Sequence, residues 1–144
     1  MTNEAREVRR VRALFLSDVH LGMRASRVAE LTDFLRHHDA DAIYLVGDIV
    51  DGWRLAKGWH WPADYHTLIE LMLDKAMAGA RIVVLPGNHD EFLRRYSRLV
   101  LGNIQLVDQA EHLTADGRRL LVIHGDQFDV ITRYHRWLAF LGDS

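Results

Sequence analysis

Residues 45–52 read Leu45-Val46-Gly47-Asp48-Ile49-Val50-Asp51-Gly52, and this stretch decides how we expect the chain to fold. An apolar run of buried-strand type ends at Gly47, where a glycine lets the backbone turn sharply. Asp48 and Asp51 follow, three residues apart. Open α/β sheets bind ligands at the carboxyl ends of their strands, which is where Asp48 would lie. We therefore expect Asp48 at the centre of the chemistry.

Three further segments have the same layout, in which an apolar run ends in small or polar residues. They are Leu14-Phe15-Leu16-Ser17-Asp18-Val19-His20, Val83-Val84-Leu85-Pro86-Gly87-Asn88-His89-Asp90 and Leu120-Leu121-Val122-Ile123-His124-Gly125-Asp126. If the four runs are neighbouring strands, one pocket collects five ligand-type side chains: Asp18, His20, Asp48, Asn88 and His124. Oxygen and imidazole donors of this kind suit two divalent metal ions that share a carboxylate.

Each of these residues also has an ordinary structural interpretation. An aspartate or asparagine after a strand, Asp126 included, often caps a helix or closes an Asx-turn. A lone histidine such as His124 is more often a hydrogen-bonded structural residue than a ligand. The coincidence of four such strand ends favours the metal site. Asp90 is expected to cap the short helix that follows it.

The composition indicates one ordinary globular domain. The 144 residues are 49% hydrophobic and 26% charged, with a formal net charge of −2, so no global positive field favours a nucleic-acid partner. The absence of cysteine excludes disulfides and thiolate metal sites. The charged N-terminus has no signal-peptide core, and no apolar run reaches the roughly 18 residues of a membrane span. We expect a cytoplasmic protein, soluble or peripherally attached at the inner membrane.

The periodicity of the sequence predicts an α/β fold with a mixed sheet. Residues 1–10 are expected to form a flexible tail and residues 11–144 one domain. A helix between the first two strands favours parallel pairing, whereas Asp116-Gly117 is typical of a hairpin. The predicted strands cover residues 11–17, 42–46, 81–85, 104–107, 111–114 and 119–123, and the helices cover 26–38, 62–78, 91–98 and 127–142.

Four motifs, in order, resemble the signatures of the calcineurin-like metallophosphoesterase superfamily: Asp18-x-His20, Gly47-Asp48-x-x-Asp51, Gly87-Asn88-His89-Asp90 and His124-Gly125-Asp126. The segments 17–22, 52–53 and 124–129 further resemble the bacterial UDP-2,3-diacylglucosamine diphosphatase group, which cleaves a pyrophosphate in lipid A synthesis. The best-established enzymes of that group carry arginine where this chain has His89. The resemblance implies the N-terminal part of a metallophosphoesterase-type mixed β-sheet sandwich flanked by helices.

The resemblance also implies a role for each residue of the site. Asp18 and His20 would bind the first metal, and Asn88 and His124 the second. Asp48 would bridge both, because two cations about 3.5–4 Å apart need an anion between them. His89 would protonate the leaving oxygen or stabilise the transition state, with Asp51 orienting its imidazole. Manganese is the expected metal, with iron and zinc as alternatives.

The superfamily pattern ends with a Gly-His-x-His element that this sequence lacks. We interpret the chain as C-terminally truncated, with weaker metal binding, little or no activity as an isolated fragment, and an exposed sheet flank that favours self-association.

The leading functional hypothesis is a metal-dependent hydrolase that splits a nucleotide-sugar lipid into UMP and a lipid phosphate by means of a dinuclear-metal hydroxide. A nuclease or general phosphodiesterase of the same superfamily and a non-catalytic scaffold are the alternatives. Trp53, Trp59 and Trp61 leave two interpretations open, packing in a lid or core and contact with a membrane interface.

Overall fold

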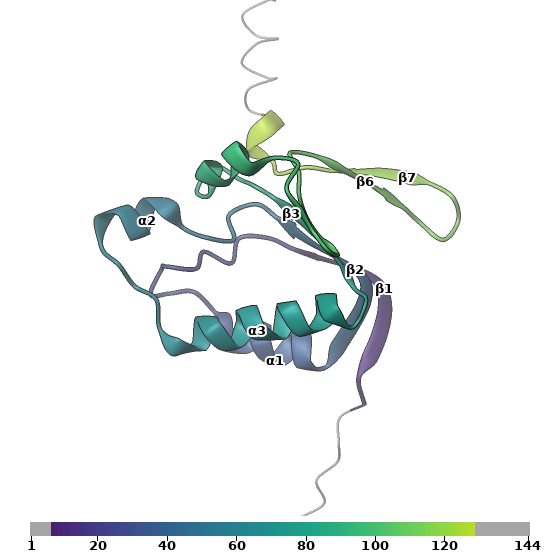
Figure 1. Cartoon of the computed structure of the whole chain (residues 1–144), viewed down its shortest axis with the longest axis horizontal. Coiled ribbons are helices and arrows are strands. Elements are labelled where there is room, and N and C mark those ends of the chain that lie inside the picture. The colour runs from purple at the N-terminus through teal and green to yellow at the C-terminus, as the bar shows by residue number, and fades with distance from the viewer. Residues whose placement is uncertain (1–6, 129–144) are drawn as a thin grey trace, which may run out of the picture.

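The main structural unit is a five-stranded sheet with the order β1-β2-β3-β5-β4, seen in a computed structural model that describes residues 7–128 (Figure 1). Four strands run parallel, and β4 pairs antiparallel with β5. The strands are β1 (Arg9–Leu16), β2 (His38–Val46), β3 (Arg81–Leu85), β4 (Val100–Leu101) and β5 (Ile104–Leu106). The predicted mixed α/β fold is confirmed, although its mixed character comes from β4, which the sequence did not predict.

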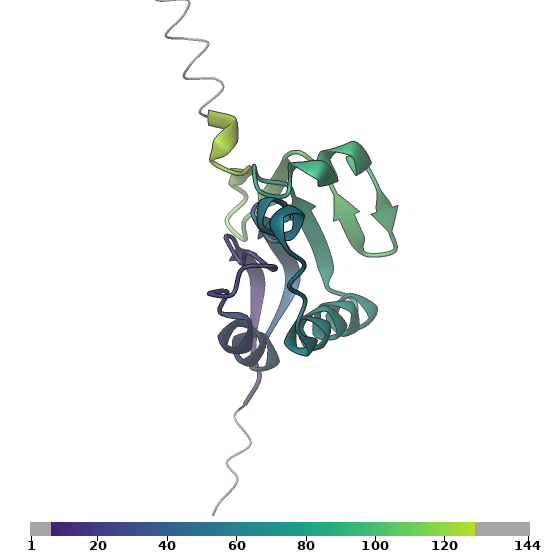
Figure 2. The ribbon, with the colours of Figure 1, turned by 90° about the vertical axis from the view of Figure 1, so that its left-hand side faces the viewer.

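Helices α1 (Val28–Arg36) and α3 (Ala63–Met77) pack side by side against one face of this sheet (Figure 2). Their apolar stripes meet Leu14 and Leu16 of β1 in a core that contains buried Leu35 and Leu68. The short helix α2 (Gly52–Lys57) and the 3-10 helix η1 (Glu91–Tyr96) follow β2 and β3. Both therefore begin close to the carboxyl edge of the sheet.

The predicted hairpin forms a separate two-stranded sheet of β6 (Ala110–Leu113) and β7 (Arg119–Val122). Val122 packs against the second face of the main sheet, where it joins Tyr44 and Val83 in a core. The ring of Tyr44 also stacks on Phe15. The prediction that the run ending at His124 is a neighbouring strand of β1, β2 and β3 was therefore wrong, because that run belongs to the separate hairpin.

Several boundaries differ from the prediction because of tertiary contacts. Arg9 pairs with His38, so β1 begins inside the predicted tail and β2 begins inside the predicted first helix. The first helix begins at Val28 and not at residue 26, because the Ser26 hydroxyl donates to the Val19 carbonyl. The helix α2 was not predicted. Most of the predicted helix 127–142 lies outside the described residues. Among residues 7–128, no helix combines the length and apolarity needed to cross a bilayer.

Candidate metal centre

The loops that leave β1, β2, β3 and β7 converge at one edge of the fold. Three of their residues have left-handed backbone conformations, with φ of 57° at Asp18, 51° at His20 and 55° at Asp48. Such conformations are unfavourable for residues other than glycine and cluster at functional sites. The strain is observed at three of the predicted metal ligands.

Asp48 lies in the middle of this edge and is only 5% exposed. Its Oδ2 is 3.6 Å from His124 Nε2 and 4.0 Å from His20 Nε2, while Asp18 Oδ1 is 3.7 Å from His20 Nε2. These separations exceed hydrogen-bond lengths but suit donors that point at a shared cation about 2.0–2.2 Å from each. The other carboxylate oxygen, Asp48 Oδ1, accepts the backbone N–H of His89 at 2.9 Å.

Two glycines allow this close approach. A side chain on Gly47, where φ is +71°, would overlap the His124 ring. One on Gly87 would overlap the Asp48 carboxylate. The glycines that precede Asp48 and Asn88 in the motifs therefore let the backbone of two loops approach the side chains that are predicted to ligate metal.

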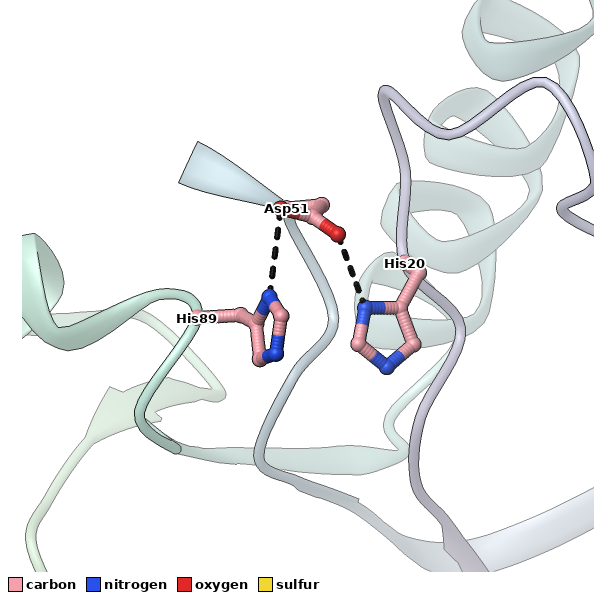
Figure 3. A group of neighbouring side chains, drawn as sticks. All are labelled: His20, Asp51 and His89. Atoms are coloured by element: carbon pink, nitrogen blue, oxygen red, sulfur yellow. Dashed lines mark hydrogen bonds and ion pairs between the residues drawn. The ribbon is translucent and has the colours of Figure 1, made fainter. Parts of the chain in front are cut away.

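Asp51 joins the imidazoles of His20 and His89 (Figure 3). Its Oδ2 is hydrogen-bonded to His20 Nδ1 at 3.1 Å, its Oδ1 lies 3.2 Å from His89 Nδ1, and it accepts the Arg54 N–H at 2.9 Å. Burial raises the pKa of the Asp51 carboxyl, but the Arg54 N–H and the two imidazoles outweigh it and hold the pKa below its ordinary value. A carboxylate at Nδ1 leaves His20 Nε2 for a metal. Asp51 thus contacts a predicted ligand as well as His89.

The His89 side chain packs against two neighbouring rings. Its imidazole lies 4.0 Å from the Trp53 ring, centroid to centroid, and 4.7 Å from the His20 ring. Its buried Nδ1 is near Asp51 but has no partner with hydrogen-bond geometry among residues 7–128. Figure 3 shows the second nitrogen of both imidazoles pointing away from Asp51. The predicted catalytic role of His89 stays a prediction.

Asn88 is half-buried on the loop between Gly87 and His89. It lines a hollow of about 510 Å³ together with Trp53, His89 and Arg94. Its backbone position places it beside Asp48, since both flanking residues contact that carboxylate or would overlap it. Ligation by the Asn88 amide stays a prediction.

Asp90 does not cap η1, and the prediction of that role was wrong. It occupies the N-cap position without a side-chain hydrogen bond to the helix. Its fully buried carboxylate instead accepts four backbone N–H groups, those of Asp48 at 3.1 Å, Ile49 at 2.8 Å, Val50 at 3.3 Å and Gly87 at 2.6 Å. The loop after β2 points three successive N–H groups to one place, and the carboxylate satisfies them. Asp90 therefore joins the loops that carry Asp48 and Asn88.

Asp126 has a positioning role that the sequence did not indicate. Its Oδ1 lies 2.9 Å from His124 Nδ1, and its Oδ2 accepts from Arg94 at 3.1 Å. This contact turns His124 Nε2 toward Asp48, as Asp51 does for His20. The signal was present as an aspartate two residues after the histidine, but that spacing is equally typical of a cap or turn.

We expect Asp126→Ala to weaken Mn²⁺ binding about 10- to 100-fold, because the His124 ring loses the partner that fixes its orientation. Isothermal titration calorimetry with MnCl₂ measures the change. Asp126→Asn keeps an oxygen for His124 Nδ1 and should recover part of the affinity, whereas the distant Asp41→Ala should change nothing. Equal affinity in wild type and Asp126→Ala would show that Asp126 does not position His124.

The profile of the family described as calcineurin-like phosphoesterase matches residues 11–142. The UDP-2,3-diacylglucosamine hydrolases of Serratia proteamaculans and Ralstonia nicotianae are 33% and 31% identical over 78% and 85% of this chain, and over 47% and 48% of their own lengths. The enzyme of that name from Cellvibrio japonicus is 30% identical over 88% of this chain and 52% of its own length. The chain thus spans about half the length of the curated relatives it matches.

Among solved structures, the Pseudomonas putida nuclease MPE matches with a TM-score of 0.44 and 25% identity, covering 72% of this chain and 50% of that chain. The family profile covers nearly the whole sequence and includes all seven predicted site residues, Asp18, His20, Asp48, Asp51, Asn88, His89 and His124. The chain therefore belongs to the calcineurin-like phosphoesterase family.

Proposed function

We propose that this chain carries the catalytic centre of a metal-dependent hydrolase that cleaves the pyrophosphate of a UDP-2,3-diacylglucosamine-like lipid into UMP and a lipid phosphate. The observation that carries the proposal is the position of Asp48 Oδ2, which lies within 4.0 Å of an imidazole nitrogen on either side. Family membership supports hydrolysis at phosphorus. The names of the relatives support the class of substrate.

The donors fit two divalent cations, for which we propose manganese. Asp18 and His20 would hold one ion, Asn88 and His124 the other, and Asp48 would bridge them. When bound, the ions supply Lewis-acid polarisation of the phosphoryl oxygens and lower the pKa of water. Asp51 and Asp126 hold the Nδ1 atoms of His20 and His124, so that the Nε2 atoms are free to ligate.

His89 would supply the proton for the leaving phosphate oxygen. The Asp51 carboxylate lies 3.2 Å from Nδ1, so Nε2, which points away from Asp51, is the nitrogen that would face the substrate (Figure 3). The Trp53 ring, tilted against the imidazole at 4.0 Å between centroids, limits its rotation. Asp51 thus serves both a metal ligand and the proposed acid.

In the complete polypeptide with Mn²⁺ present, we expect His89→Ala to lower kcat for UMP release about 100-fold, since a positioned general acid contributes about 10²–10⁴-fold. UMP is measured by chromatography after incubation with the lipid substrate. A p-nitrophenyl ester leaves without a proton, so its hydrolysis should fall much less. UMP release that survives Asp48→Ala would refute the proposal. If the protein instead cleaves DNA and retains it on nitrocellulose in a salt-sensitive way, a nuclease would be favoured.

A further inference from the structure

A second hollow, of about 460 Å³, lies between the loop that follows His20 and the helix α2. Three cationic side chains line it, those of Arg24, Arg54 and Lys57, and its lining contains no carboxylate. Among residues 7–128, none of the three makes an ion pair. The hollow therefore concentrates positive charge on a chain whose formal net charge is −2.

An exposed aromatic ring completes the wall. Trp59 lines the hollow and is 78% exposed, which is unusual for so large an apolar side chain. It is also oriented, because Trp61 stacks on it at 5.7 Å between ring centroids. The Trp59 indole thus has a fixed orientation and an exposed face, and it lies beside cations that have no ion-pair partner in the described part of the chain. This combination suits a ligand that has an aromatic ring and a phosphate.

The walls of the hollow are preorganised by buried contacts. Trp61 packs edge-on against buried Tyr65 at 5.0 Å, and the Tyr65 hydroxyl accepts the Gly22 N–H at 3.0 Å. A side chain on Gly22 would meet Leu55 of α2, so the loop and the helix are in direct contact. The indole and the backbone of the walls are therefore in place before binding, and mainly the three cationic side chains would be ordered by it.

The hollow lies close to the metal centre along the chain and in space. Met23 and Ala25 line it and also line a hollow of about 380 Å³ that contains Asp18 and His20. The backbone of Arg54 is hydrogen-bonded to Asp51, which contacts His20. A molecule held here lies next to the proposed site of phosphorus chemistry.

We propose that Arg24, Arg54, Lys57 and Trp59 form a nucleoside monophosphate site, with the cations on the phosphate and the indole stacked on the base. This inference rests on the proposed function only for the choice of base, which would be the uracil of the UMP half of the substrate. Arg54 and Lys57 stand three residues apart on α2 and so project from one side of the helix.

Calorimetry of the whole chain with EDTA present tests the site without metal or turnover. UMP should bind at least about tenfold more tightly than uridine or inorganic phosphate, because each of these lacks one half of the recognition. Arg54→Ala and Lys57→Ala should each weaken UMP about tenfold, and so should Trp59→Ala, whereas Trp59→Phe should retain most of the affinity.

Arg36→Ala, an exposed arginine on α1, is the matched control and should leave UMP binding unchanged. All the substituted side chains are exposed, and an unchanged thermal melting curve shows that each variant folds. UMP binding no tighter than that of phosphate, or equal in wild type and the Arg54→Ala, Lys57→Ala double variant, would overturn the site. UMP binding in the expected pattern together with failed lipid hydrolysis would support the site while refuting the proposed function.

Discussion

Asp90→Ala is expected to lower the free energy of unfolding by about 4–5 kcal/mol, which is a large part of the stability of a domain this size. The substitution removes the acceptor of four backbone N–H groups in a place that water does not reach. Each buried donor left without a partner costs about 1–3 kcal/mol, and partial relaxation of the loops recovers some of the sum. Urea denaturation without added metal measures the loss.

Asp90→Asn separates the acceptor role from the charge. One carboxylate oxygen serves Asp48 and Gly87 and the other serves Ile49 and Val50. An amide keeps one oxygen but faces the other pair of donors with an NH₂ group, so about half of the loss should remain. Asp74→Ala, an exposed aspartate on α3, should change stability by less than about 0.5 kcal/mol. A similar effect of Asp74→Ala and Asp90→Ala would contradict the argument.

The ligand-type residues could be predicted from the sequence because their signal is local. An apolar run followed by Asp, His or Asn marks the end of a strand, and parallel strands end at the same edge. The structure accordingly links Asp18 to His20, His20 to Asp48 and Asp48 to His124 by separations of 3.7, 4.0 and 3.6 Å. His124 follows a strand of the separate hairpin. The side chains therefore come together because their strands end at the same place, although the strands do not all belong to one sheet.

The positioning residues could not be predicted, because their roles depend on partners far along the chain. Nothing near Asp90 indicates that the N–H groups of residues 48–50, some 40 positions earlier, point toward it. Asp126 is similar, since its contact with Arg94 spans 32 residues. The boundaries of β1 and β2 were misplaced for the same reason, as mutual pairing extends both strands beyond their apolar runs.

Asp48→Asn is expected to lower the rate of UMP release by about three orders of magnitude and Mn²⁺ affinity by at least about 100-fold. A shared carboxylate compensates the repulsion between two cations, and a neutral amide cannot. Each 1.4 kcal/mol of charge stabilisation lost in the transition state lowers the rate about tenfold, so a loss of several kcal/mol accounts for the expected effect. The effect should exceed that of His89→Ala, which leaves the metal ligands intact.

The same substitution should leave the metal-free fold intact, which distinguishes a ligand from a structural residue. The amide has the shape of the carboxylate, and its oxygen can still accept the His89 N–H that Asp48 Oδ1 accepts. With EDTA, the melting temperature of Asp48→Asn should therefore be equal to that of wild type or higher, because a buried charge has been removed.

Addition of Mn²⁺ should raise the melting temperature of wild type and of the control Asp41→Asn, since a ligand that binds only the folded state stabilises it. It should not raise that of Asp48→Asn. An equal Mn²⁺-induced shift of the melting temperature in all three proteins would show that Asp48 holds no metal, and it would refute the proposed dinuclear centre.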